Sequence, residues 1–226
     1  MNFMRKISPP KTEEELINRC MNIQGLSFTQ LSISLDLPIP LNPVQRKGWV
    51  GMALELALGA DANNKAAPDF QSLAVELKTL PLAKSGKPAE STFVTSIPLL
   101  TIHQQSWKTS QCYSKLQRVL WIPIEGDREI PFEQRRIGMG FLWSPNEHEE
   151  QILCSDWDYL THQISSGNLE CVDATVGVYL QVRPKAANGK SLCYGYDTEG
   201  SKVQTLPRGF YLRSKFTSQI LLNASS

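Results

Sequence analysis

The residue types best suited to chemistry lie in one short segment of the chain. Pro68-Asp69 is followed, six residues later, by Glu76-Leu77-Lys78. On a β-strand, residues 76 and 78 project from one face while Leu77 points into the opposite layer. A turn or strand bend at residues 71–74 would carry Asp69 beside them. The spacing therefore predicts two carboxylates and a lysine at one end of a strand.

Two carboxylates at the edge of a sheet favour a hard cation with oxygen ligands. Asp69, Glu76 and the backbone carbonyl of Leu77 form a donor set that suits Mg²⁺, which keeps most of its waters and also binds phosphate oxygens. Such a metal lowers the pKa of bound water, and a nearby lysine orients that water or offsets new negative charge. The pattern predicts metal-dependent hydrolysis of a phosphodiester.

The triplet alone is weak evidence, because a chain with 22 acidic residues contains about one acid-x-Lys pattern by chance. Its context is more informative. Glu76 and Lys78 interrupt an otherwise apolar segment, where charges are costly to bury unless they are paired or bound to metal. The alternative interpretation is an ion pair on an edge strand.

Two other charged residues, Glu55 and Lys115, lie outside this segment. Glu55 lies within a largely apolar helical segment and by pattern faces solvent. Lys115 precedes a predicted strand and by pattern is a surface lysine. Neither has a role that its spacing alone indicates.

The elements that position these residues follow from capping signals and periodicity. Thr12 and Ser27, each followed three residues later by Glu or Gln, predict the starts of two short helices. Residues 49–58 predict a buried helix that ends at Gly59. Ser144, with Pro145 after it, predicts a helix to about residue 165. Further strands are expected at 70–80, 92–99, 118–124, 178–182 and 210–212, and a last helix at 215–222. The fold class is α/β, a mixed sheet flanked by helices.

Composition excludes several classes of protein. The 226 residues are 41% hydrophobic and 20% charged, which is typical of globular proteins and not of disordered chains or rods. No apolar run is long enough to span a membrane, and no export signal begins the chain, so we expect a cytoplasmic protein. Five scattered cysteines without a Cys-x-x-Cys pair predict neither a disulfide framework nor a zinc knuckle.

Charge is distributed unevenly although the net value is +1. Residues 144–173 hold seven acids and no Lys or Arg, whereas residues 183–215 hold seven bases against two acids. The basic stretch, with aromatic residues between its charges, is a candidate for phosphate binding, with a solvated surface as the alternative. The acidic stretch is typical of a solvated helix face.

Eight blocks of the sequence closely resemble the MutH family of DNA mismatch-repair endonucleases, and the resemblance runs from about residue 8 to residue 217. The blocks are KGW (47–49), ALE (53–55), PDF (68–70), VELKT (75–79), VLWIP (119–123), LWSPNE (142–147), LQVRPKAAN (180–188) and LPRGFYL (206–212). The resemblance implies a restriction-endonuclease-like fold whose two lobes flank a DNA cleft. We expect a catalytic lobe at about 15–110 and a DNA-reading lobe at about 1–14 and 111–226.

The same resemblance implies an activity and its residues. The activity is a Mg²⁺-dependent cut in the unmethylated strand of a hemimethylated GATC site. Asp69, Glu76 and Lys78 match the catalytic trio, with Glu55 as an added acid and Lys115 as an added lysine. The DNA-contacting positions matched are Lys47, Phe93, Arg183, Pro184, Lys185 and Tyr211, with Tyr211 near the adenine whose methylation is sensed. The expected partners are double-stranded DNA, the ATPase MutL as activator, and MutS through MutL.

Two other functions remain open at this stage. One acid-x-Lys site per chain predicts one cut per monomer, which suits a nickase. A restriction enzyme that reads the same tetranucleotide would instead make double-strand breaks, as a longer chain or a stable dimer. A non-catalytic DNA-binding protein of the same fold is the second alternative, although intact Asp69, Glu76 and Lys78 oppose it.

Overall fold

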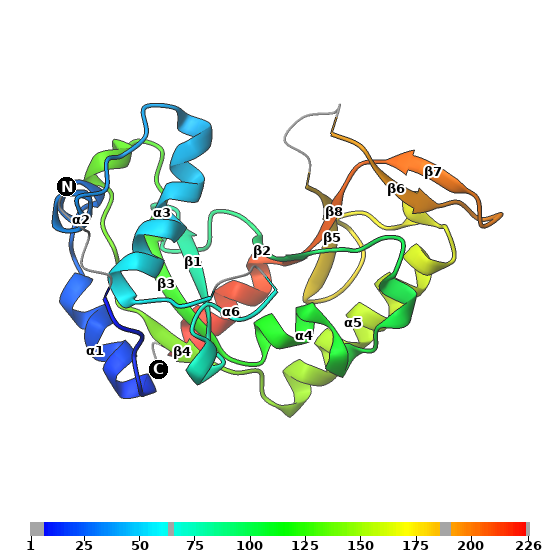
Figure 1. The fold of residues 1–226 in the computed structure, drawn as a ribbon, viewed down its shortest axis with the longest axis horizontal. Coiled ribbons are helices and arrows are strands. Elements are labelled where there is room, and N and C mark those ends of the chain that lie inside the picture. The colour runs from blue at the N-terminus through cyan, green and yellow to red at the C-terminus, as the bar shows by residue number, and fades with distance from the viewer. Residues whose placement is uncertain (1–6, 63–65, 186–190, 225–226) are drawn as a thin grey trace. The chain divides into compact units, whose positions relative to one another are not determined.

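The computed structural model describes residues 7–62, 66–185 and 191–224 and has the expected mixed α/β fold (Figure 1). It divides into two compact units, each built from two stretches of the chain. Unit 1 comprises Met1–Ala89 and Arg118–Ser144, and unit 2 comprises Glu90–Gln117 and Pro145–Ser226. No helix in the described part of the chain is long and apolar enough to cross a membrane.

The unit boundaries differ from the lobes expected from the sequence. Residues 1–14 and 118–144 group with the segment that carries Asp69 and Glu76, whereas residues 90–110 group with the C-terminal half. The reason is strand pairing. Residues 118–144 supply two strands that pair in the sheet containing Glu76, and residues 90–110 supply a strand that pairs near the C-terminus.

The sheet of unit 1 has three strands in the order β1-β3-β4. These are β1 (Glu76–Leu82), β3 (Val119–Glu125) and β4 (Phe141–Trp143). β1 pairs with β3 in parallel, with Glu76 opposite Val119 and Lys78 opposite Trp121. β3 is central and nearly all apolar, so its side chains are buried on both faces. β1 is therefore an edge strand of this sheet.

Three helices cover one face of that sheet. They are α1 (Glu13–Ile23), α2 (Phe28–Leu35) and α3 (Pro43–Leu58), and α3 lies against β1 (Figure 1). Phe28 and Trp49 from these helices belong to a buried core that also takes in Leu77, and the partly buried Phe132 packs against both rings. The buried face of β1 is thus fixed by apolar contacts, which leaves the opposite face for its charged residues.

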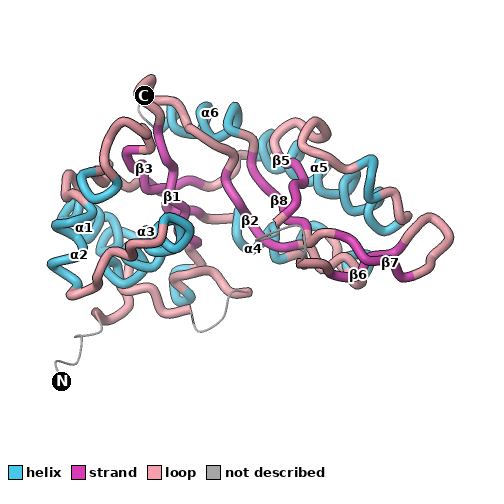
Figure 2. The backbone as a smooth tube through the Cα atoms, turned by 90° about the horizontal axis from the view of Figure 1, so that it is seen from above, coloured by secondary structure: helices cyan, strands magenta, loops and turns pink. Residues whose placement is uncertain are grey.

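The main sheet of unit 2 is antiparallel, in the order β2-β8-β5 (Figure 2). Its strands are β2 (Thr92–Ser96), β8 (Arg208–Leu212) and β5 (Leu180–Pro184), and a separate hairpin joins β6 (Cys193–Tyr196) to β7 (Lys202–Thr205). The helices of unit 2 are α4 (Gln111–Leu116), α5 (Glu147–Ser165) and α6 (Ser214–Ala224). α5 packs against β5.

A buried carboxylate on α5 sets the start of β5. Asp156 is 7% exposed and accepts hydrogen bonds from the backbone amides of Val178, Tyr179 and Leu180, at 2.7 to 2.9 Å. A carboxylate that accepts several N–H groups in this way offsets the cost of its own burial. The first residue of β5 is therefore held by the helix that packs against the strand.

Several predicted element boundaries are wrong, for local reasons. α3 begins at Pro43 instead of 49, because Asn42 accepts the amide of Val44 and proline takes the first helical position. α5 begins after Asn146, which forms a capping box with Glu149, so Ser144 is not its cap. Residues 71–73 form a 3-10 helix, and the strand expected from 70 begins at Glu76. The sequence did not predict α4, β4, β6 or β7.

An ion pair ties the first helix to the central strand of unit 1. The Arg118 guanidinium donates to both oxygens of Glu13, with Nε to Oε1 at 2.8 Å. These hydrogen bonds hold the pKa of Glu13 below its usual value. The carbonyl of the same Arg118 accepts the backbone amide of Glu76. The ion pair thus holds Arg118 in place, and the carbonyl of Arg118 forms the hydrogen bond to Glu76 at the start of the β1–β3 pairing.

We expect Glu13→Gln to destabilise unit 1 slightly near neutral pH, by about 0.5 kcal/mol, because the pair is partly solvent-exposed. The pKa of Glu13 is lower in the folded protein, so its contribution exists above the unfolded pKa and is lost as pH falls through the folded pKa. Urea unfolding should show a difference from wild type near neutrality that diminishes as the pH falls through the lowered pKa of Glu13. Glu14→Gln, an exposed neighbour on α1, is the matched control, and equal losses in both variants would contradict the pairing.

Candidate functional site

A tight loop carries Asp69 to the start of β1, as the spacing predicted. Phe70 and Val75 exchange two backbone hydrogen bonds, closing a loop that contains the 3-10 helix Gln71–Leu73. Ala74 completes the turn in a left-handed conformation with φ of 52°. The Asp69 carboxylate then accepts the backbone amide of Leu77, with Oδ2 to N at 2.9 Å. Asp69 is therefore joined to the strand that bears Glu76 and Lys78.

Glu76 and Lys78 form a buried ion pair on the edge strand. Lys78 Nζ lies 2.6 Å from Glu76 Oε1, and the two side chains are 12% and 3% exposed. Leu77, between them, points into the hydrophobic core of unit 1, so the expected alternation of faces is confirmed. The ion pair of the alternative interpretation is present, and Asp69 lies at the same end of the strand.

The donor set at this end of β1 fits a hard divalent cation. The backbone of Glu76 faces β3, since its amide donates to Arg118. The amide and carbonyl of Leu77 therefore face the free edge, where the amide meets Asp69. Two carboxylates and a carbonyl are oxygen ligands of the kind that Mg²⁺ and Ca²⁺ prefer. In the described part of the chain no three His, Cys, Asp or Glu side chains gather as a metal site, so the Leu77 carbonyl is the third oxygen donor offered at this end of β1.

Two further residues matched by the resemblance lie on α3 in unit 1. Glu55 is half-buried, so the prediction that it faces solvent is only partly correct. Its carboxylate extends back along the helix towards Gly51. Lys47 is exposed near the start of the same helix. α3 packs against β1, so the helix that carries Glu55 lies next to the strand that carries Glu76.

Lys115 lies near the end of α4, in unit 2, and is only 6% exposed. The interpretation as an ordinary surface lysine is therefore wrong. Burial of an ammonium group is costly, so buried lysines are uncommon among the lysines of folded proteins. The structure brings Asp69, Glu76 and Lys78 together in unit 1, whereas Lys115 belongs to unit 2.

Four of the matched DNA-contacting residues form a cluster on the main sheet of unit 2. Phe93 on β2 stands opposite Tyr211 on β8, and their rings meet edge to face at 5.3 Å. Lys185 Nζ lies 3.3 Å from the centroid of the Phe93 ring, and the Arg183 guanidinium lies 5.9 Å from the Tyr211 ring. We call these four residues the reading cluster. Pro184 is exposed between its two cations.

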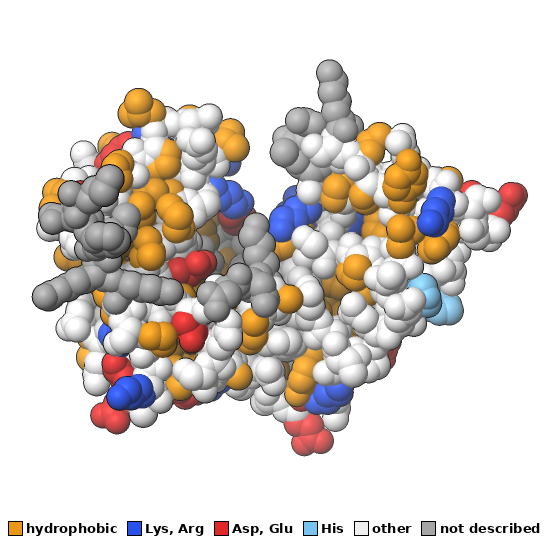
Figure 3. All heavy atoms as spheres, in the orientation of Figure 1, with side chains coloured by type: hydrophobic (Ala, Val, Ile, Leu, Met, Phe, Trp, Pro, Cys, Tyr) orange, Lys and Arg blue, Asp and Glu red, His pale blue; other side chains and the backbone are white. Residues whose placement is uncertain are grey.

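Gly209 on β8 makes room for the reading cluster. A Cβ atom at this position would lie 2.8 Å from the Phe93 ring and 3.1 Å from the carbonyl of Thr95. The ring thus occupies space that a side chain on the middle strand would fill. Blue Lys and Arg side chains gather beside β5 and β8 on the face shown in Figure 3. The exposed Arg183 and Lys185 belong to this part of unit 2.

Not all of the basic stretch faces solvent. Arg208 donates to the carbonyl of Val172, and Arg213 donates to the carbonyl of Val176. These two arginines therefore hold the loop that precedes β5, and they are poorly placed to follow a phosphate backbone. Lys190, which also belongs to the basic stretch, and residues 186–188 of one resemblance block lie outside the described residues.

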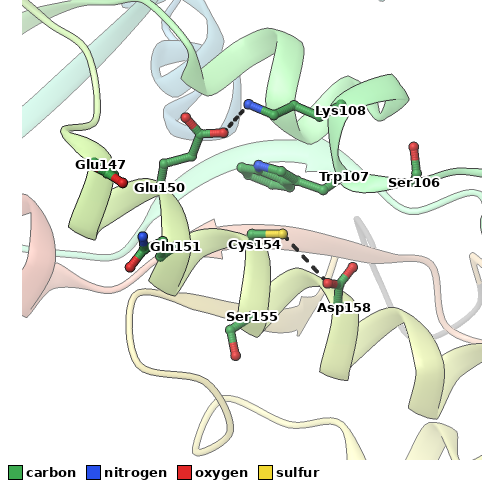
Figure 4. A pocket seen from close by; sticks show the side chains of 9 residues that line it. All are labelled: Ser106, Trp107, Lys108, Glu147, Glu150, Gln151, Cys154, Ser155 and Asp158. Atoms are coloured by element: carbon green, nitrogen blue, oxygen red, sulfur yellow. Dashed lines mark hydrogen bonds and ion pairs between the residues drawn. The ribbon is translucent and has the colours of Figure 1, made fainter.

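A pocket of about 800 Å³ on the acidic stretch has different chemistry (Figure 4). It lies between α5 and the 3-10 helix Trp107–Thr109, and Lys108 pairs with Glu150 at its rim. Burial, with Asp158 adding to it, raises the pKa of the Cys154 thiol. A raised pKa leaves less of the Cys154 thiol as the reactive thiolate near neutral pH, so this cysteine is not activated as a nucleophile.

Comparison with known proteins gives one consistent result. A family model described as the DNA mismatch repair enzyme MutH matches residues 58–156. The DNA mismatch repair protein MutH of Vibrio vulnificus is 49% identical over 215 residues, which cover 95% of each chain. The proteins of the same name from Pasteurella multocida and Escherichia coli are 48% and 46% identical, covering 94% and 95% of this chain and 96% and 94% of their own.

Sequence reasoning missed three residues that shape the reading cluster. Gly209 provides space for Phe93, and two serines, Ser91 and Ser96, contact the cations of the cluster. Serine and glycine are common near strand ends, so their types and spacing carried no signal. Only the pairing of β2, β8 and β5 reveals what they contact.

The buried ion pair yields a prediction about stability. Lys78→Met should cost about 2–3 kcal/mol of unfolding free energy, because it removes the lysine that pairs with the buried Glu76 carboxylate at 2.6 Å. Glu76→Gln combined with Lys78→Met should cost clearly less than the sum of the single changes. Urea unfolding of the four proteins measures this coupling.

Lys84→Met is the matched control for that experiment. Lys84 pairs with Glu129 at 3.4 Å just beyond β1, but both side chains are about four-fifths exposed. Its loss should cost less than about 0.5 kcal/mol. Additive effects of the Glu76 and Lys78 changes would contradict the coupled pair.

Proposed function

The chain belongs to the MutH family of DNA mismatch repair enzymes, and we propose that it is a DNA endonuclease that nicks the unmethylated strand of hemimethylated GATC sites with Mg²⁺. The observation that best supports the proposal is the hydrogen bond between Asp69 and the Leu77 amide, which joins the first carboxylate to the strand of Glu76 and Lys78. The family is one of metal-dependent nucleases, and this donor set suits such a metal.

The catalytic chemistry is assigned to four residues of unit 1, namely Asp69, Glu76, Leu77 and Lys78. Asp69, Glu76 and the Leu77 carbonyl would hold the metal, and a bound metal would supply an activated water and charge neutralisation at the phosphodiester. Lys78 Nζ donates a hydrogen bond to Glu76 Oε1 at 2.6 Å, which holds the lysine side chain at this end of the strand. The lysine orients the attacking water and offsets the charge that develops on the phosphate. From the family we carry over Glu55 as an added acid and Lys115 as an added active-site lysine.

Recognition of the site is assigned to the reading cluster of unit 2 and to Lys47. An arginine bonds to the O6 and N7 atoms of guanine through two parallel N–H groups in the major groove, which suits the exposed Arg183. Lys185 and Lys47 are suited to phosphate contacts, which fix the position of the duplex without reading bases. Phe93 and Pro184 complete the apolar part of the contact surface.

Tyr211 is the proposed sensor of adenine methylation. An N6-methyl group adds bulk and removes one donor orientation in the major groove. A side chain packed against the amino group therefore accepts the unmodified adenine and rejects the methylated one. Tyr211 is held against Phe93 at 5.3 Å, so its ring has a defined orientation before DNA arrives.

Family membership also supports the proposed partners and setting. We assign MutL as the activating ATPase, with MutS acting through MutL, and we place the enzyme in the cytoplasm as a monomer. A single acid-x-Lys site per chain suits one cut per monomer. A restriction enzyme for the same site would cut both strands, so the nature of the product distinguishes the two activities.

We expect Asp69→Asn to reduce Mg²⁺-dependent nicking by about 100-fold or more while DNA binding persists. Asparagine keeps an oxygen that accepts the Leu77 amide, so the loop should stay folded while the carboxylate is lost. The measurement is nicking of a GATC plasmid with and without Mg²⁺, on unmethylated, hemimethylated and fully methylated DNA. Nicked product supports the proposal, whereas linear product from wild type would favour the restriction activity.

Asp36→Asn is the matched control for that change. Asp36 is exposed at the end of α2 with φ of 50°, a conformation that asparagine adopts readily. It should nick like wild type. Cleavage by Asp69→Asn at the wild-type rate would remove the metal-site assignment.

We expect Tyr211→Ala to narrow the difference between hemimethylated and fully methylated sites, chiefly because cleavage of the good substrate slows by about 10-fold or more. Single-turnover cleavage of the two substrates measures this difference. Tyr194→Ala, which removes an exposed tyrosine from the β6–β7 hairpin, serves as the control. If Tyr211→Ala keeps the full rate and full discrimination, the methyl sensor lies elsewhere.

A further inference from the structure

Arg183 of the reading cluster is held by Ser91, a residue to which the proposed function assigns no role. Arg183 Nη1 donates a hydrogen bond to the Ser91 hydroxyl at 2.7 Å. Ser91 is half-buried and directly precedes β2, whereas Arg183 lies on β5, at the other edge of the sheet. The arginine side chain therefore crosses the middle strand, β8, to reach the serine.

The path of this side chain is supported along its length. Its guanidinium lies near the ring of Tyr211, at 5.9 Å, and Gly209 on the same strand has no side chain to obstruct the sheet surface. Lys185 follows a similar path, with its Nζ over the Phe93 ring and 3.4 Å from the Ser96 hydroxyl. Arg183 on β5 therefore contacts the serine that precedes β2, and Lys185, directly after β5, contacts the serine that ends β2.

We propose that Ser91 is a positioning residue that sets Arg183 in its DNA-reading orientation before DNA binds. The inference rests on the proposed function, because it assumes that Arg183 reads a base of the site. A guanidinium has five N–H donors, and Ser91 uses one of them. Among the described residues no other hydrogen-bond acceptor of Arg183 is present, so enough donors remain for two parallel bonds to a guanine.

The affinity for the specific site increases because the Arg183 side chain is already ordered before DNA binds. An exposed arginine samples many rotamers, and fixing one of them on binding weakens the specific complex. Ser91 fixes the orientation in the free protein, so the specific complex no longer bears that cost. Non-specific complexes gain nothing, since phosphate contacts tolerate many arginine orientations. Ser91 therefore acts on specificity more than on general affinity.

The test is equilibrium binding to two short duplexes of equal length, one with a GATC site and one with the same bases scrambled, at matched salt and without divalent metal. Ser91→Ala should lower the ratio of specific to non-specific affinity by about 5-fold, with non-specific affinity unchanged. Ser91→Thr keeps the hydroxyl and should stay within about 2-fold of wild type. Ser155→Ala, an exposed serine on α5, should match wild type.

A double variant separates positioning from a general structural role. If Ser91 acts through Arg183, then Ser91→Ala combined with Arg183→Ala should discriminate no worse than Arg183→Ala alone. A further loss in the double variant would overturn the inference. Thermal melting of each variant checks folding. Ser91→Cys, similar in size but a weak acceptor, replaces the alanine variant if that one unfolds, and it should show the same loss of discrimination.

The outcomes also separate this inference from the proposed function. If Arg183→Ala loses discrimination and Ser91→Ala keeps it, Ser91 has no positioning role while the function stands. If Arg183→Ala discriminates like wild type, Arg183 is not a base-reading residue and the inference falls with it. A wild-type protein without preference for GATC would refute the proposed function and the role of Ser91 together.

Discussion

The buried ion pair between Glu76 and Lys78 is the constraint on which unit 1 depends. A carboxylate that is 3% exposed must be compensated, and the lysine at 2.6 Å does so from the same strand. The strand must then keep its register, because a slip of one residue would turn both charges into the core. The parallel pairing with β3 and the burial of Leu77 under α1, α2 and α3 fix that register. Apolar packing on one face thus maintains charged chemistry on the other.

In unit 2 the corresponding constraint is the absence of a side chain. Gly209 leaves space on the middle strand, and the Phe93 ring occupies it. The Tyr211 ring packs edge to face against Phe93. Lys185 lies over the Phe93 ring and Arg183 lies near the Tyr211 ring. The buried Asp156 on α5 holds the start of β5, and Arg183 and Lys185 lie at and just after the other end of that strand. Some charged residues of the acidic and basic stretches are therefore internal contacts and not surface charges. Asp156 of the acidic stretch holds the start of β5, and Arg208 of the basic stretch donates to the carbonyl of Val172.

Contacts between residues close together in the sequence were predicted well, and contacts between distant segments were predicted poorly. The alternation of Glu76, Leu77 and Lys78 and the turn that returns Asp69 to them are short-range features, and both are confirmed. The burial of Lys115, the structural use of Arg208 and Arg213, and the contacts of Ser91 depend on partners far along the chain. The unit boundaries differed for the same reason, since pairing of β2 with β8 leaves no trace in either segment alone.

Because each unit is assembled from two separate stretches, synthesis of the chain imposes an order on folding. Unit 1 has all its residues once Ser144 has been made, whereas β2, complete at Ser96, lacks its neighbour β8 until residues 208–212 follow. During that interval the nascent chain carries an unpaired strand, a segment prone to pair with other chains. The contact is also distant in sequence, which slows its formation. Assembly of unit 2 is therefore the step of biogenesis at which this protein is most exposed to aggregation.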